Sequence, residues 1–182
     1  MAHWRLITLL SLVFAAMVFA ILLAVSRGPR GVSPDATSPK TERVVIGGHA
    51  FDLEVAADDA SRERGLMNRA SIDEHGGMLF IFPDKGVRKQ SFWMKNCLVD
   101  IDIIYLDSKG LVTATHRMKA EPPRRANESD SAYEARMREH AYPSGYPAQF
   151  AIELRSGWLD QLNLRVEDRI TLDLDRLKAM AR

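Results

Sequence analysis

An uncharged apolar segment near the amino terminus constrains this chain more than any other feature of its sequence. Leu6 to Val25 contains no charged residue and is bounded by Arg5 and Arg27. As an α-helix this segment would extend for about 30 Å, the thickness of the hydrocarbon core of a bilayer. The sequence therefore predicts a single-pass membrane anchor within residues 1–27.

A cleavable signal sequence is the alternative interpretation of the same segment. Ala24 and Ser26 place small side chains where a signal peptidase needs them, although the apolar part of a signal peptide normally spans only about 7–15 residues. Both interpretations place the globular part outside the cytoplasm, either tethered to the cell membrane or secreted after cleavage. Because Arg5 precedes the segment while Arg27 and Arg30 follow it, the charges do not fix the orientation, and a cytosolic domain remains an alternative.

Length, charge and cysteine content limit what the rest of the chain can be. The 182 residues have room for one domain, and 46% apolar residues are enough to fill its core. With 25 Lys and Arg against 24 Asp and Glu, no strong field exists to hold nucleic acid. The single cysteine, Cys97, excludes an internal disulfide and a lipoprotein anchor, and its type favours a buried apolar role over a nucleophilic one.

The sequence predicts three regions along the chain. Residues 1–27 form the anchor or signal sequence, and residues 28–42 are a linker whose prolines and glycines prevent packing. Residues 43–182 form the folded domain. Within it, residues 121–141 form a polar insertion with a helix capped near Ser129.

Short apolar and alternating runs predict that this domain is rich in β-strands. Strands are expected at residues 44–46, 51–55, 77–82, 91–94, 101–106, 111–116, 150–154 and 169–174. A short helix is expected over residues 60–64, capped by Asp58 or Asp59 and ended by Gly65. The predicted fold class is mainly β (α+β), a compact antiparallel barrel-like domain with one or two short helices, preceded by a transmembrane helix.

Motifs for metal, nucleotide or nucleophilic chemistry are absent from the sequence. The five histidines lack the spacing that brings two ligands to one ion, so no metal site is predicted. Ser144 and the glycine pairs fit neither a nucleophile elbow nor a phosphate-binding loop, so no cofactor and no catalytic residue are predicted.

The densest group of chemically useful side chains runs from Phe92 to Asn96. Trp93 can stack on a flat polar ligand while Lys95 and Asn96 supply hydrogen-bond donors, and Arg69 is a further candidate for the same cluster. The plainer interpretation is a core aromatic beside a polar turn and a solvated arginine.

Asp100 and Asp102 form a second candidate group. On a strand their carboxylates would point to the same face about 7 Å apart. Such a pair suits acid–base chemistry in a hydrolase or lyase, or it forms the wet face of a half-buried strand.

Three blocks of this sequence together resemble the DUF192 family, also called UPF0127. They are GLMNR at residues 65–69, GMLFIF at residues 77–82 and FWMKN at residues 92–96, continuing to Asp102, and the likeness extends from about Phe51 to Leu172. The resemblance implies a compact β-rich domain with a short helix, often exported behind an apolar amino terminus. It implies no established activity.

The resemblance also separates family-like positions from departures. By resemblance the family-like polar positions are Arg69, Lys95, Asn96 and Asp102. The departures are Cys97 where threonine is usual, Asp100 where proline is usual and Glu167 where glycine is common.

The sequence as a whole favours a membrane-tethered accessory or small-ligand-binding module, with a hydrolase or lyase that uses Asp100 and Asp102 as an alternative. Its candidate ligand-binding residues are Arg69, Trp93, Lys95, Asn96 and Asp102. The expected partners are the membrane and an unidentified small polar ligand or protein. A protein-interaction module that uses residues 121–141 is the remaining alternative.

Overall fold

The computed structural model describes residues 40–182 of the chain. The predicted anchor at residues 1–27 and residues 28–39 of the predicted linker lie outside this range. Within residues 40–182, no helix combines the length and apolar character needed to cross a membrane. The anchor therefore stays a prediction from the sequence.

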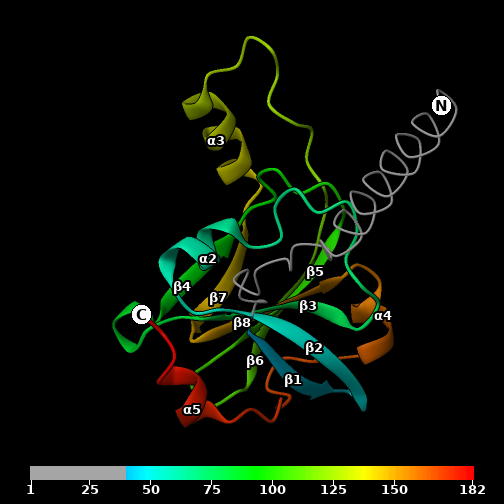
Figure 1. The fold of residues 1–182 in the computed structure, drawn as a ribbon, viewed down its shortest axis with the longest axis vertical. Coiled ribbons are helices and arrows are strands. Elements are labelled where there is room, and N and C mark those ends of the chain that lie inside the picture. The colour runs from blue at the N-terminus through cyan, green and yellow to red at the C-terminus, as the bar shows by residue number, and fades with distance from the viewer. Residues whose placement is uncertain (1–39) are drawn as a thin grey trace, which may run out of the picture. The chain divides into compact units, whose positions relative to one another are not determined.

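A six-stranded sheet forms the centre of the fold (Figure 1). In spatial order its strands are β1 (Thr41–Ile46), β2 (His49–Ala56), β3 (Gly76–Ile81), β8 (Phe150–Arg155), β5 (Ile101–Leu106) and β6 (Val112–Met118). β1 and β6 are the two edges, so the sheet is open. The mainly β fold class is confirmed, whereas the expected barrel-like closure is wrong, because the sheet keeps two open edges. The expected one or two short helices are also an underestimate, because residues 40–182 contain four α-helices.

The first two strands form the hairpin that the sequence predicts. Gly47 and Gly48 connect β1 to β2, and both have positive φ angles, which suit glycine. β2 then pairs with β3 in parallel, and a crossover that contains α2 (Asp59–Arg64) connects them. All other pairs in this sheet are antiparallel.

Helix α2 begins and ends as its sequence predicts. The Asp58 side chain accepts a hydrogen bond from the Ser61 backbone N–H at 2.9 Å, and the Ser61 hydroxyl accepts one from the Asp58 N–H in return. This reciprocal capping satisfies two N–H groups that a helix start leaves open. The helix ends at Gly65, whose φ of 45° is in the region that favours glycine.

A separate two-stranded sheet consists of β4 (Arg88–Phe92) and β7 (Tyr142–Ala148). A 3₁₀ turn, η1 (Asp84–Gly86), precedes β4, which lies earlier in the chain than the strand expected at 91–94. Strand β7 was not predicted from the sequence, and Pro143 and Pro147 lie within it. A two-stranded sheet tolerates proline where no ladder N–H is required.

Two apolar clusters cover the two faces of the main sheet, which explains why β5 is buried along its whole length. One face, termed here the α4 face, includes Ile104 and Leu106 of β5 and Trp158 of α4 (Trp158–Leu162). The opposite face, termed the pocket face, includes Ile103 and Tyr105 of β5 and side chains from the β4 and β7 region. The alternating residues of one strand therefore belong to different cores.

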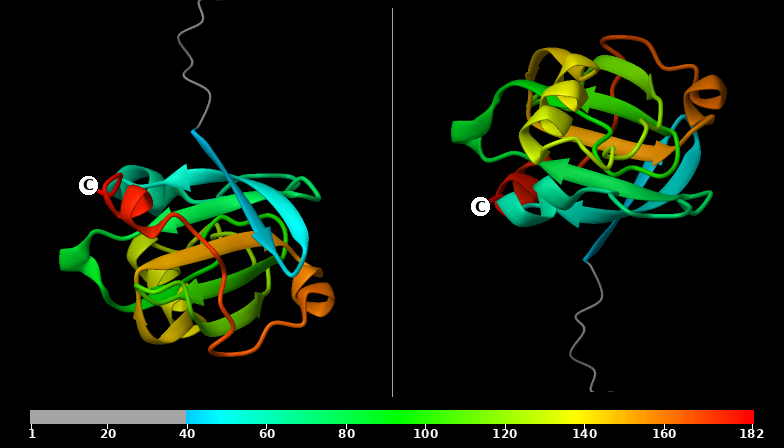
Figure 2. Two further views of the ribbon diagram at one scale, coloured as in Figure 1. Left: turned by 90° about the horizontal axis from the view of Figure 1, so that it is seen from below. Right: turned by 90° about the horizontal axis from the view of Figure 1, so that it is seen from above.

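The carboxy-terminal segment covers the α4 face. The prediction of a strand at residues 169–174 is wrong. This segment forms only an isolated bridge, between Leu111 and Arg169, and is followed by α5 (Leu174–Lys178). Ile170 packs into the apolar cluster, so the apolar pattern serves to cover the sheet. The chain then returns beside α2, where the Arg182 N–H donates to the Ala57 carbonyl at 2.8 Å (Figures 1 and 2).

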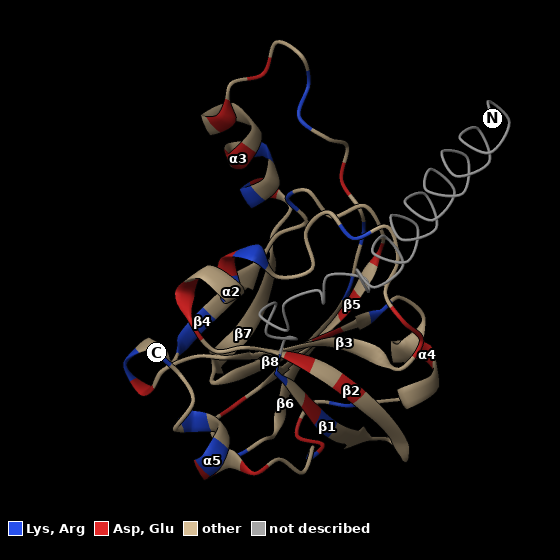
Figure 3. Ribbon diagram, in the orientation of Figure 1, with Lys and Arg blue, Asp and Glu red and all other residues tan. Residues whose placement is uncertain are grey.

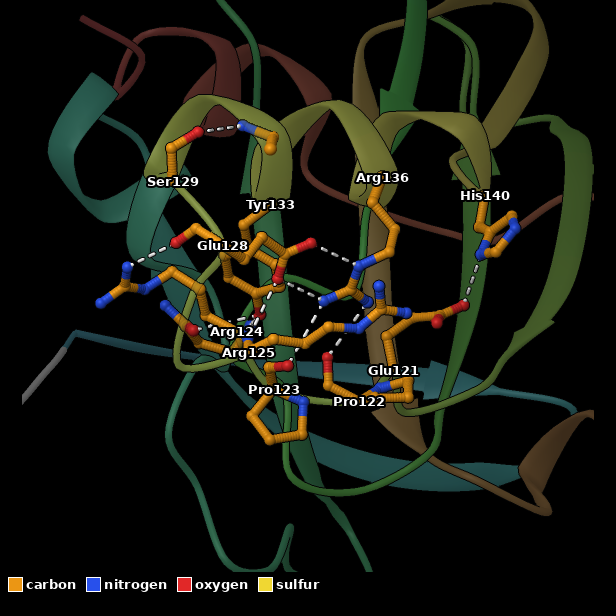
Figure 4. A network of polar contacts seen from close by, with 12 residues as sticks. Glu121, Pro122, Pro123, Arg124, Arg125, Glu128, Ser129, Tyr133, Arg136 and His140 are labelled. Atoms are coloured by element: carbon orange, nitrogen blue, oxygen red, sulfur yellow. Dashed lines mark hydrogen bonds and ion pairs between the residues drawn. The ribbon is translucent and has the colours of Figure 1, made fainter.

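The polar insertion contains the helix that the sequence predicts, α3 (Asp130–Glu139), with Ser129 as its cap. A network of ion pairs and hydrogen bonds holds the preceding loop to this helix (Figure 4). At its centre the Glu128 carboxylate accepts from the Arg136 guanidinium at 2.9 Å and from the Arg125 backbone N–H at 3.0 Å. These bonds lower the pKa of Glu128 to about 2. These contacts connect the loop to α3 within residues 121–141.

Candidate ligand-binding site

A cavity of about 370 Å³ opens on the pocket face between α2, β4 and β8. Its apolar and aromatic lining comes from Leu66, Met67, Phe80, Phe82, Phe92 and Trp93. Its polar lining includes residues of α2 and β4, together with Cys97 and Glu153. This size and mixed lining are typical of sites for small molecules.

Glu153 lies in the lining of this pocket and is its most unusual residue. Its position on β8 is opposite Met78 of β3 and Ile103 of β5, so it occupies a central place in the sheet. The residue is only 4% exposed, and within residues 40–182 its Oε2 atom is buried without a hydrogen-bond partner. Burial raises the pKa of Glu153 to about 8, and only the more distant charge of Arg69 opposes this effect.

The main chain at Gly65 leaves room above this carboxyl group. A β-carbon added at Gly65 would lie 3.4 Å from Cζ of Phe80 and 3.8 Å from Oε2 of Glu153. Any larger side chain at this position would therefore fill the pocket above the acid. The glycine thus both ends α2 and keeps the Glu153 side of the cavity open.

Aromatic rings form one wall of the pocket. Phe92 packs edge-to-face against Phe80, with ring centroids 4.8 Å apart, and also against Phe82 at 6.4 Å. Interlocked rings of this kind hold each other in place, so this wall is already formed without a ligand.

Charges of both signs surround the opening, as Figure 3 shows for α2. Arg62 is engaged, because its guanidinium donates to Asp59 at 2.6 Å and to the carbonyl groups of Ile81 and Arg182. Glu63 and Arg64 follow on the same helix, and Arg88 is contributed by β4. The opening therefore carries no single-sign charge.

Cys97 contributes a thiol to the pocket, but in an unreactive form. The residue is buried, and desolvation, with a smaller effect of the nearby Glu153, raises the pKa of the thiol to about 12. Because the thiolate is the nucleophilic form of cysteine, a raised pKa opposes reactivity. Its burial and its raised pKa support the interpretation of Cys97 as a small buried side chain.

Of the ligand-binding residues predicted from sequence, Trp93 lines the pocket, whereas Lys95 and Asn96 contact the insertion helix. Lys95 pairs with Glu134 of α3 at 2.6 Å, and the Asn96 N–H donates to the Tyr133 hydroxyl at 3.1 Å. Asn96 also has a φ of 56°, so it forms a turn after β4 rather than continuing the strand. The Lys95 side chain and the Asn96 backbone therefore help to hold α3 against the loop after β4.

Arg69 lies outside the pocket lining and forms a two-point ion pair with Glu54 of β2. The two Arg69 nitrogens lie 2.5 and 2.7 Å from the Glu54 oxygens. This hydrogen bonding lowers the pKa of Glu54 and raises that of Arg69. The pair connects the loop after α2 to the sheet.

Asp102 lies on the opposite face of the sheet from the pocket. Its Oδ2 atom accepts hydrogen bonds from the backbone N–H groups of Gly157 at 2.9 Å and Leu159 at 2.8 Å. It therefore caps the start of α4 from the neighbouring strand. Asp100 instead pairs with Lys119 at 2.7 Å and accepts from the Ala120 N–H, so each predicted carboxylate has a separate set of protein partners.

The sequence analysis did not single out Glu153, although a signal for it was present. Its strand, Phe150–Arg155, is apolar before the acid, and an acid at an inward position of a buried strand is costly unless it is paired or functional. For the part of the chain that the structure describes, no group of three or more His, Cys, Asp or Glu is placed to hold a metal ion.

Comparisons with known proteins agree on the fold and leave the function open. The family model DUF192, described as an uncharacterized ACR, matches residues 42–172. A search of curated proteins finds no significant match. The chain is 27% identical to the crystal structure of a putative transcription regulator from Sinorhizobium meliloti 1021, with a TM-score of 0.57 over 74% of this chain and 95% of that one.

A second solved structure is similar in the same way. It is a protein of unknown function from Novosphingobium aromaticivorans DSM 12444, with 23% identity, a TM-score of 0.56, and coverage of 80% of this chain and 94% of that one. Since the match covers nearly all of both solved chains, this domain forms a folded unit by itself in those proteins.

Proposed function

Because this chain belongs to the uncharacterised DUF192 family, its function must be inferred from its own geometry, and we propose that the domain binds a small molecule in the pocket between α2, β4 and β8. The observation that carries this proposal is Glu153, a buried acid without a hydrogen-bond partner in the lining of an open cavity. Proteins seldom leave a buried polar atom unpaired unless something else satisfies it. Because Glu153 lines an open cavity, a bound ligand can reach this acid and supply the partner.

The aromatic wall supports the same proposal. Phe82, Phe92 and Trp93 line the cavity while each is only partly buried, so their remaining surface is free to contact a ligand. Trp93 is further held by the cations of Lys95 and Arg138, which lie 5.3 and 4.8 Å from its ring. A ring fixed in this way loses little freedom when it stacks on a ligand.

A fragment screen with two matched variants tests the pocket. Trp93→Ala removes part of the wall, and Lys89→Ala removes an exposed side chain of β4 that is outside the lining. We expect fragments detected by ligand-observed NMR to bind the Lys89→Ala protein normally and the Trp93→Ala protein at least about tenfold more weakly, equivalent to about 1.4 kcal/mol. Fragments that bind all three proteins equally would place the ligand site elsewhere.

The proposal also includes a location at the cell membrane with the domain exported. It is supported by the uncharged apolar segment from Leu6 to Val25, whose length suits a spanning helix. Fractionation of cells that express the full chain should recover it with the membrane, and protease added on the outer side of the cell membrane should digest the domain. Recovery of a soluble product that begins after Ser26 would instead favour the cleaved signal.

A further inference from the structure

The chemistry of Glu153 indicates which ligand class the pocket suits. Oε2 is buried without a partner, and no hydrogen bond within residues 40–182 contributes to the pKa of this group. A carboxyl group forms its strongest hydrogen bonds when it is ionised and faces a cationic donor. Within residues 40–182, no cationic donor forms a hydrogen bond with Oε2 of Glu153.

Arg69, whose charge acts on Glu153, and Arg62, which lines the same pocket, already have acidic or carbonyl partners. Arg69, which lowers the pKa of Glu153, is held by the Glu54 carboxylate through both of its terminal nitrogens. Arg62 is held by Asp59 and by two backbone carbonyls. The ion pairs that these arginines form leave them poorly placed to neutralise Glu153.

The other titratable groups around the acid do not supply a positive charge. Cys97 from the loop after β4 and Tyr105 from β5 are neutral, because burial raises the pKa of each side chain. On α2 the neighbouring side chains of Glu63 and Arg64 carry charges of opposite sign, and Arg88 on β4 is exposed at the opening. The buried part of the pocket therefore combines an unpaired acid with aromatic rings.

We propose that the pocket binds a small molecule that carries a cationic nitrogen, such as a primary ammonium, which pairs with the Glu153 carboxylate while the aromatic wall covers its apolar part. This inference rests on the proposed binding function and names the ligand class of that same site. Aromatic faces attract cations and a buried carboxylate pairs with them, so both elements of the pocket select the same charge.

The release of a proton on binding provides a way to test this ligand class by measurement. In the free protein at neutral pH the Glu153 carboxyl group holds its proton, because the pKa is about 8. Binding of an ammonium ion forms the ion pair and releases that proton to the buffer. With a pKa of about 8, the ionised fraction rises about 50-fold from pH 6 to pH 8, and the affinity for the cation rises by the same factor.

Three probes of similar shape test the proposal, namely benzylamine, benzyl alcohol and benzoate. Calorimetry on the full chain in a non-ionic detergent, and on residues 40–182, at pH 6 and pH 8 measures affinity. Repeating each titration in two buffers with different ionisation enthalpies measures the proton release. We expect benzylamine to bind at least tenfold more tightly than the other two probes, more tightly at pH 8 than at pH 6, with release of close to one proton at pH 6.

Two matched variants complete the test. Glu153→Gln should reduce the affinity for benzylamine at least tenfold and abolish the proton release, whereas Glu139→Gln, exposed on α3 and outside the pocket lining, should change neither by more than about twofold. Preferential binding of benzoate or benzyl alcohol in the pocket would overturn the cationic ligand and leave the pocket intact. Failure of all three probes would also overturn it, and the fragment screen would then decide separately whether the pocket binds anything.

Discussion

Replacement of Glu153 by glutamine should stabilise the domain, and the gain should increase with pH. The pKa of this carboxyl group is about 8 in the fold, against 4.5 for an unperturbed side chain. Between these values the unfolded chain has lost the proton and the folded chain keeps it, so stability decreases as the pH rises. Above pH 8 the stability decreases no further, because the buried group then ionises in the folded chain as well.

The size of the effect follows from the difference between the two pKa values. At 1.36 kcal/mol per pKa unit, the change from 4.5 to about 8 corresponds to about 5 kcal/mol above pH 8 and about 3 kcal/mol at pH 7. Glutamine has a similar shape and cannot ionise. The Glu153→Gln protein should therefore equal the natural domain near pH 4.5 and exceed its stability by these amounts at higher pH.

Urea denaturation of residues 40–182 at pH 5, 7 and 9, followed by circular dichroism, measures this difference. Other carboxyl groups, such as Glu54 and Glu128, have lowered pKa values and act in the opposite direction. They are shared by both proteins, so subtraction isolates Glu153. The reasoning is refuted if the difference does not change with pH, or if Glu153→Gln is the less stable protein at pH 9. The first result would mean that the pKa of Glu153 is the same in the folded and unfolded chain, and the second that the fold stabilises the ionised acid.

Other substitutions and reagents test the remaining structural assignments. Asp102→Ala removes both hydrogen bonds that hold the start of α4. It should lower the free energy of unfolding in urea by about 3 kcal/mol and leave benzylamine binding unchanged. A variant that keeps its stability but loses a hydrolase or lyase activity would instead support a catalytic Asp102. Arg136→Ala should return the pKa of Glu128 from about 2 towards its ordinary value in an NMR titration of the carboxyl carbon, and an unchanged value would show that the backbone bond dominates. Iodoacetamide at pH 8 should leave Cys97 unmodified in the folded domain and react once urea unfolds it, whereas rapid reaction in the fold would contradict its burial. Glu167→Gly should stabilise the domain by about 1 kcal/mol, because Glu167 is exposed with a φ of 75°; a lower melting temperature would show that its side chain has another role.

The elements that were predicted correctly have local causes. Asp58, Ser61 and Gly65 specify the two ends of α2 through contacts within a few residues. Gly47 and Gly48 specify the first hairpin in the same way. The continuous apolar run of β5 and the family blocks around it identified the β-rich domain and its family without any long-range information.

Of the ligand-binding residues predicted from sequence, only Trp93 lies in the pocket lining, because the positions of the others depend on long-range partners. Lys95 looked like a ligand-binding cation, but its partner Glu134 is contributed by a helix in the insertion. Asp102 looked like an acid beside these residues, yet the alternation of β5 directs it to the other face of the sheet, where α4 receives it. Nothing local to either residue indicates which partner it meets.

The sequence by itself determined the apolar segment that predicts an anchor, the β-rich character of the domain, the ends of its first helix and its family, since each depends on neighbouring residues or on pattern. Only the tertiary structure decided that the sheet stays open, that the apolar pattern near Ile170 covers a face instead of adding a strand, and that Glu153 lies unpaired in a pocket. The physical reason is that burial and pairing of a polar group depend on which distant segments surround it. Those segments come together only when the chain folds.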